Sequence, residues 1–164
     1  MLFRSVDLYT TQLAEIVESE KKLARGIMTL VEIRDSNAAA YEKSKMDNSE
    51  AEALHQSRMR DLKEAQKEHD VAAEEFHILA QKALKGESVD EDKTVKLHLE
   101  VRGLVEEISY RNGLVVDSRI ALGKTVKKLK EDEKLFKSIV TKYDIVRAKL
   151  DAIPVQKAER SEEH

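Results

Sequence analysis

Apolar residues recur at alternating steps of three and four along most of this chain. At the N-terminal end this spacing joins Val6, Tyr9, Leu13, Ile16, Glu20, Leu23, Ile27 and Leu30, of which only Glu20 is charged. Such a heptad pattern is typical of α-helices that pack against each other along a narrow seam. The pattern predicts an all-α protein built from a few long helices.

Two segments read as helix starts and interrupt the heptads. Ser88-Val89-Asp90-Glu91 follows Gly86, and Ser49-Glu50-Ala51-Glu52 follows Asp47-Asn48. The first is a helix stop followed by a capping box, and the second is a weaker start. We therefore predict an elongated antiparallel coiled-coil hairpin, with one arm over about 5–85, a tip at 86–88 and a second arm over about 89–153. A further break near 46–49 would give three helices instead.

The second arm carries the same spacing, with one expected irregularity. Its apolar residues slip by one position between Leu122 and Val126, which predicts a stutter that relaxes the supercoil. Pro154 is expected to end the helix, because proline cannot continue a helical hydrogen-bond ladder. We expect one helical domain over residues 1–153 and a polar, flexible tail over 154–164.

Composition narrows the function classes. Charged residues make up 37% of the chain, aromatic residues 4%, and cysteine is absent, which excludes disulfides and thiolate chemistry. The net charge of −3 gives no general attraction to nucleic acid, so nucleic acid is not an expected partner. No run of about 18 apolar residues is present, and the first residues do not resemble a secretory signal. We expect a cytoplasmic protein, with peripheral membrane contact as an open alternative.

No arrangement of residues suggests catalysis or metal binding. Glu52/His55 and Glu74/His77 have metal-like spacing, but the two pairs lie about 33 Å apart along one helix and cannot share an ion. His69 falls at a seam position and is expected to be half-buried. Phosphate-binding loops and catalytic triads are missing. We expect no enzyme activity, no cofactor and no metal.

Two groups of residues are candidates for partner binding. Near the tip, an alanine-rich seam is expected to leave apolar side chains under-buried, namely Phe76, Leu79, Leu84 and Leu97. Residues 124–149 hold nine basic and four acidic side chains, and the candidate contacts in this basic strip are Lys127, Lys128, Lys130, Lys134 and Lys137. A solvated helix face is the alternative interpretation of this strip. Charged residues also fall at seam positions: Glu20, Arg34, Arg111 and Glu133.

Two stretches, 127–136 (KKLKEDEKLF) and 156–164 (QKAERSEEH), together with the length and the near-symmetric hairpin, resemble the stalk proteins of type III export systems, the FliJ/YscO family. This resemblance implies a rod-like stalk or adaptor that engages an export ATPase ring and the export gate. Its partners would be protein components of that assembly, and self-association also stays open. The chain departs from the family at its start, Arg4-Ser5-Val6-Asp7, where a basic turn is usual.

A second resemblance points to another class of function. Residues 61–76 (DLKEAQKEHDVAAEEF) and 135–143 (LFKSIVTKY) are similar to helices of BAR domains of the sorting-nexin kind. This resemblance implies a dimer that binds curved membranes through basic residues. We favour a non-enzymatic protein-interaction function in protein transport or secretion, with a membrane-curvature or trafficking module as the alternative.

Overall fold

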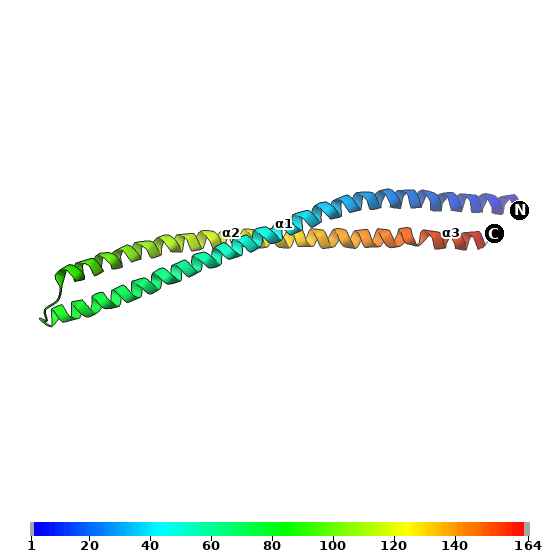
Figure 1. Cartoon of the computed structure of the whole chain (residues 1–164). Coiled ribbons are helices and arrows are strands. Elements are labelled where there is room, and N and C mark those ends of the chain that lie inside the picture. The colour runs from blue at the N-terminus through cyan, green and yellow to red at the C-terminus, as the bar shows by residue number, and fades with distance from the viewer. Residues whose placement is uncertain (1, 163–164) are drawn as a thin grey trace. The chain divides into compact units, whose positions relative to one another are not determined.

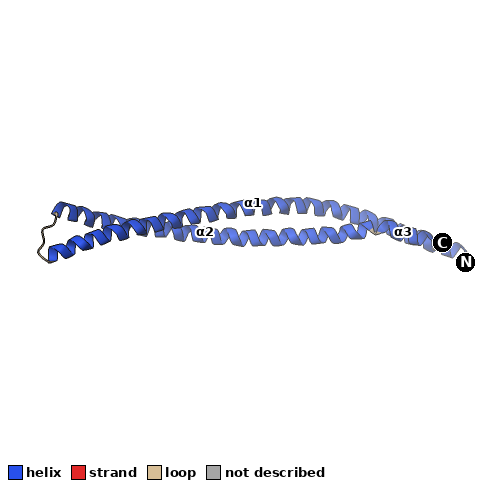
Figure 2. Ribbon diagram, turned by 60° about the horizontal axis from the view of Figure 1, so that its bottom comes forward, coloured by secondary structure: helices blue, strands red, loops and turns tan. Residues whose placement is uncertain are grey.

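The structure, a computed structural model, describes residues 2–162, with side chains described for residues 6–160. It contains three helices, α1 (Leu2–Leu84), α2 (Glu91–Asp151) and α3 (Ile153–Glu162), and no strand within the described residues. The chain reverses once, through residues 85–90, so that α1 and α2 run antiparallel (Figure 1). Figure 2 shows that helix accounts for nearly all of the described chain. The predicted all-α helical hairpin is confirmed.

The hairpin divides into two compact units, and each contains a piece of both arms. Unit 1 comprises Met1–Lys45 with Lys128–His164, and unit 2 comprises Met46–Lys127. The buried hydrophobic residues of unit 1 are Ile27, Ile139 and Ile153, and those of unit 2 are Ala65, Ala72, Leu97, Leu104 and Val115. Since a two-helix seam covers only one stripe of each helix, each core is narrow.

The tip is built from a helix stop at Gly86 and a helix start at Asp90. Gly86 has a φ of 80°, which glycine adopts without steric cost. The Gly86 N–H donates to the Ala83 carbonyl at 3.1 Å, and the Glu87 N–H donates to the Lys82 carbonyl at 3.0 Å. These two bonds form a Schellman motif, which satisfies carbonyls at the end of α1.

The start of α2 differs from the prediction by two residues. Asp90 caps the helix, because its Oδ1 accepts the Lys93 N–H at 3.2 Å and its carbonyl accepts the Thr94 N–H at 3.0 Å. Ser88, which the sequence suggested as the cap, lies in the connecting loop. Aspartate serves as well as serine at this position. The residue three places after Asp90 is Lys93, so the reciprocal capping box is absent.

The possible break near 46–49 does not occur, and α1 continues without interruption from Leu2 to Leu84. Asp47 and Asn48 are half-buried in the seam. The Asn48 Oδ1 accepts a hydrogen bond from the Thr125 hydroxyl at 3.0 Å, so this side chain bonds across to α2. Asn48, one of the polar residues that suggested a helix start, therefore bonds across the seam, while Ser49 and Glu50 are exposed within a continuous helix.

Helical structure also continues beyond Pro154, where we expected a flexible tail. α2 ends at Asp151, and α3 begins at Ile153, with Pro154 in its first turn. Proline is tolerated there because the N–H of that position has no intrahelical acceptor. Ile153 is 3% exposed, and the Lys157 Nζ lies 2.5 Å from the Glu20 Oε2. Early turns of α1 thus lie beside α3 (Figures 1 and 2), while residues 163–164 of the expected tail lie outside the described residues.

The predicted stutter in α2 is also absent. The least exposed residues keep alternating steps of three and four through this region, by way of Leu122, Thr125, Leu129, Asp132 and Phe136. The slip appeared because the sequence analysis assigned Val126 and Glu133 to the seam instead of Thr125 and Asp132. The same holds for α1, where Tyr41, Ser44, Asn48, Ala51, His55 and Arg58 continue the series beyond Arg34. The heptads are continuous, but their middle portion is polar.

Candidate functional site

Two cross-helix polar pairs occupy the seam of unit 2. The His55 Nδ1 lies 2.8 Å from the Ser118 hydroxyl, and the Thr125 hydroxyl donates to Asn48 at 3.0 Å. Sequence reasoning missed both pairs, because it did not continue the heptads of the first arm beyond Arg34. Their positions in the 3-4 series are the signal that would have found them.

The His55–Ser118 pair has the atoms of a nucleophile and base but not their arrangement. Ser118 is 2% exposed, and its hydroxyl donates to the Val115 carbonyl at 2.9 Å. The imidazole tautomer decides which atom donates in the His55–Ser118 bond, but the serine oxygen is buried at the helix interface in either case. A catalytic pair requires the serine to donate to the histidine and to face a substrate. This pair instead satisfies two polar groups at the helix interface.

Unit 1 contains a third buried polar pair. The Ser44 hydroxyl, 2% exposed, donates to the carboxylate of Asp132, which is 9% exposed. The Lys128 Nζ also lies 3.6 Å from this carboxylate, one helical turn away. The carboxylate is thus compensated by a hydroxyl from α1 and an ammonium from α2. No buried side-chain polar atom among the described residues is left without a partner.

Each charged residue that the sequence placed in the seam has a specific contact. Glu20 pairs with Lys157, and the guanidinium of Arg34 lies 4.7 Å from the centre of the Tyr143 ring. Such cation–π contacts contribute about 0.5–1 kcal/mol at exposed sites. Charges at these half-buried positions are therefore accommodated within the hairpin itself.

The other two charged positions form ion pairs that shift pKa values. Arg111 donates two hydrogen bonds to the Glu107 Oε1, at 3.0 and 2.8 Å, and these bonds raise the pKa of Arg111. Glu133 lies 2.8 Å from the Lys137 Nζ, and this hydrogen bond lowers the pKa of Glu133. Asp132, not Glu133, occupies the buried position, which corrects the sequence-based placement.

The four apolar candidates near the tip do not form one exposed patch. Leu97 is 7% exposed and belongs to the core, contrary to the expectation that it is under-buried. Phe76 and Leu79 are half-buried, and the Phe76 ring packs against His98 at a centroid distance of 5.4 Å. Leu84 is 82% exposed. Of these four candidates, only Leu84 is therefore fully exposed.

The five candidate lysines of the basic strip are all exposed on α2. Lys128 and Lys137 form ion pairs with Asp132 and Glu133, which offsets part of their charge. The other three have no carboxylate within ion-pair distance among the described side chains, and they are Lys127, Lys130 and Lys134. Of the five candidates, these three therefore present an uncompensated positive charge.

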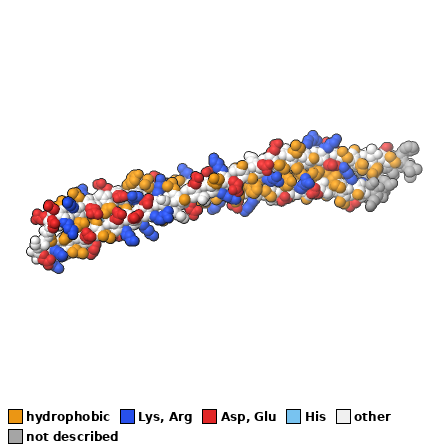
Figure 3. All heavy atoms as spheres, in the orientation of Figure 1, with side chains coloured by type: hydrophobic (Ala, Val, Ile, Leu, Met, Phe, Trp, Pro, Cys, Tyr) orange, Lys and Arg blue, Asp and Glu red, His pale blue; other side chains and the backbone are white. Residues whose placement is uncertain are grey.

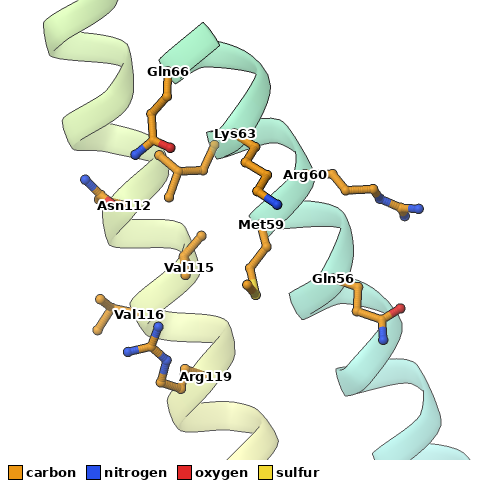
Figure 4. Close-up of a pocket in the computed structure, with 10 residues that line it drawn as sticks. Gln56, Met59, Arg60, Lys63, Gln66, Asn112, Val115, Val116 and Arg119 are labelled. Atoms are coloured by element: carbon orange, nitrogen blue, oxygen red, sulfur yellow. The ribbon is translucent and has the colours of Figure 1, made fainter.

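A groove on the side of unit 2 was not anticipated from the sequence. It has a volume of about 670 Å3 and lies between α1 and α2. Its apolar lining consists of Leu62 and Val115 near the seam and Met59 and Val116 towards solvent. Figure 4 shows side chains from both helices around this space, with Met59 on α1 and Val115 and Val116 on α2.

The polar residues around this groove carry charge of one sign. Its cations are Arg60, Lys63 and Arg119, its amides are Gln56, Gln66 and Asn112, and it has no acidic lining residue. None of the three cations has a carboxylate within ion-pair distance in the part of the chain that the structure describes. A second groove in unit 2 has the opposite character, since it contains Lys67 and four glutamates, Glu64, Glu68, Glu75 and Glu100.

The metal-like spacings do not assemble a site. Among the described residues, no group of three or more His, Asp and Glu side chains lies close enough to hold an ion. His55 is engaged by Ser118, and the His69 Nδ1 lies 3.3 Å from the Asp70 carboxylate.

None of the described helices combines the length and the apolar character that crossing a bilayer requires. The sequence matches no protein-family model and no curated protein.

Proposed function

We propose that this protein is a non-enzymatic coiled-coil adaptor or stalk that binds other proteins along the outer faces of its helical hairpin. The observation that carries this proposal is the set of large apolar side chains that point away from the seam. Unit 2 exposes Val95 and Leu99 one turn apart, and also Val116 and Ile120, with exposed fractions of 57, 60, 49 and 55%. Figure 3 shows hydrophobic side chains interspersed with charged ones on the face that it presents.

Single apolar residues scattered over a surface are common and need no explanation, but neighbouring exposed apolar residues are typical of interaction sites. Two residues four positions apart lie on one face of a helix, at a separation that an apolar partner side chain can bridge. Burying these side chains on association would contribute about 25 cal/mol per Å2 of apolar area. The partner expected from the family resemblance is a component of an export ATPase assembly.

Site-specific photo-crosslinking tests this function. A benzoylphenylalanine residue is placed at Val116 or Leu99 of the full chain, and at the exposed, charged position Arg102 as a matched control. We expect adducts with other proteins in host cells from the apolar positions and few from Arg102. Equal labelling at all three positions, or none at any, would contradict the proposal.

A membrane-curvature function is the second candidate, favoured by the uncompensated lysines of the basic strip. Each exposed lysine near an anionic surface contributes about 1 kcal/mol to binding. Co-sedimentation with vesicles containing phosphatidylserine tests this function. Binding that is lost when Lys127, Lys130 and Lys134 are changed to Glu would favour it over the adaptor, and absence of binding would exclude it.

A further inference from the structure

The groove of unit 2 has the spacing of a helix-binding face. Its lining residues on α1 include Gln56, Met59, Lys63 and Gln66, at steps of three, four and three. On α2 they include Asn112, Val116 and Arg119, at steps of four and three. These are the steps by which α1 and α2 meet each other, so a third helix lying in the groove would contact both arms at each turn.

The dimensions of the groove suit a short helix. The α1 lining from Gln56 to Gln66 extends for about 15 Å, or nearly three turns, at about 1.5 Å per residue. Val115 is 5% exposed and forms the floor, while Met59 and Val116 are 47 and 49% exposed and form the sides. Methionine adapts its shape to different apolar neighbours, which suits a binding surface.

The charge of the groove indicates which kind of helix it binds. Arg60, Lys63 and Arg119 border the apolar lining, and no carboxylate of the described chain pairs with them. No acidic residue lines this groove, whereas four glutamates line the second groove of unit 2. Unpaired cations beside an apolar groove favour a partner with carboxylates on both sides of its apolar face.

We propose that the groove between α1 and α2 around Met59 and Val116 binds an acidic amphipathic helix of a partner protein. The apolar side chains of that helix enter the groove, and its carboxylates pair with Arg60, Lys63 and Arg119. This is the helix-in-groove mode, with apolar anchors at positions i, i+3, i+4 and i+7. The inference rests on the proposed adaptor function and assigns one partner class to one surface.

Binding of designed peptides to the full chain tests this inference. The first probe is a fluorescein-labelled, 21-residue peptide with leucine at 3-4 spacing and glutamate beside the leucines. The second has lysine in place of every glutamate. We expect fluorescence anisotropy to show at least about tenfold tighter binding of the acidic peptide, with the difference shrinking as salt rises.

Groove variants and matched controls locate the binding. Val116→Asp and Arg119→Glu should each weaken acidic-peptide binding at least about tenfold, the usual effect of losing an important contact. Val71→Asp changes a 60% exposed valine in the acidic groove, and Arg102→Glu changes an exposed arginine elsewhere on α2. These two controls should leave the affinity within about twofold. Circular dichroism confirms that all four variants remain helical.

Three outcomes would overturn the inference. The first is that the two peptides bind with equal affinity, and the second is that the control variants lose as much affinity as the groove variants. The third is that the natural chain is a dimer in light-scattering measurements and the groove variants are monomers. The last outcome would identify a second copy of the chain as the occupant. Failure of the adaptor function can be told apart from failure of the groove inference. If the protein is not an adaptor, crosslinks in cells are also absent at Leu99, which lies outside the groove.

Discussion

Ser44→Ala should destabilise the hairpin by about 2 kcal/mol. The serine hydroxyl donates to the Asp132 carboxylate, and both side chains are buried at the interface of α1 and α2 in unit 1. A hydrogen bond to a charged group is worth about 1.5–3 kcal/mol, and its loss leaves a buried carboxylate without that donor. The remaining partner, Lys128, is 66% exposed, so its ion pair contributes only about 0–1 kcal/mol.

A double-mutant cycle separates this pair from other effects of substitution. Asp132→Ala alone should also cost about 2 kcal/mol, because it leaves the Ser44 hydroxyl buried without its acceptor. The double variant should cost about 2 kcal/mol or less rather than the sum of the two single changes, since removing both partners leaves no unsatisfied group. Urea unfolding of the full chain at pH 7, followed by circular dichroism at 222 nm, measures each value.

Ser49→Ala is the matched control, because Ser49 is an exposed serine on the same helix. It should change the stability by less than about 0.5 kcal/mol. If Ser44→Ala also has so small an effect, or if the two single changes add in the double variant, the buried bond does not contribute as argued.

Three further predictions concern the helix ends and the surface. Gly86→Ala should cost about 1–2 kcal/mol in urea unfolding because φ is positive there, whereas Gly103→Ala should gain about 0.5–1 kcal/mol, since an added Cβ meets no atom within 4 Å. Asp90→Ala should cost about 1 kcal/mol through loss of the α2 cap, and amide hydrogen exchange should rise in the first turn of α2 while the last turn of α1 is unchanged. The Lys137 hydrogen bond lowers the folded-state pKa of Glu133 below its ordinary value of 4.5, so this contact stabilises the fold at neutral pH and is lost as the pH falls through that lowered pKa. Urea midpoints measured from about pH 6 to pH 3 should therefore fall more steeply for the natural chain than for Lys137→Ala, and equal slopes would contradict the assignment.

The hairpin was predictable because its signals are strong and local. Gly86 beside a cluster of polar residues marks the reversal, and the 3-4 spacing of leucines, isoleucines and valines marks the faces that meet. The exact cap was harder to predict, since Ser88 and Asp90 have almost equal preference for the position. Only the hydrogen bond to the Lys93 N–H distinguishes them.

The polar middle of the seam was not predictable from hydrophobicity alone. Asn48 resembles a residue before a helix start until its partner Thr125, 77 residues away, is known. Asp132 likewise appears no better suited to the interface than Glu133 until Ser44 is placed opposite it. The groove at Met59 and Val116 depends on the pairing of the two arms, which sequence spacing does not give.

Because the chain is synthesised from its N-terminus, contacts between the two arms form long after the first arm is made. Contacts across the seam join residues 63 positions apart at His55–Ser118 and 137 positions apart at Glu20–Lys157. At roughly 5–20 residues per second, Glu20 waits about 7–27 s for its partner to leave the ribosome. Throughout that interval the apolar stripe of the first arm has no second arm to cover it. During synthesis the chain therefore exposes apolar surface longest at the start of α1, the end whose contacts lie farthest away in the sequence.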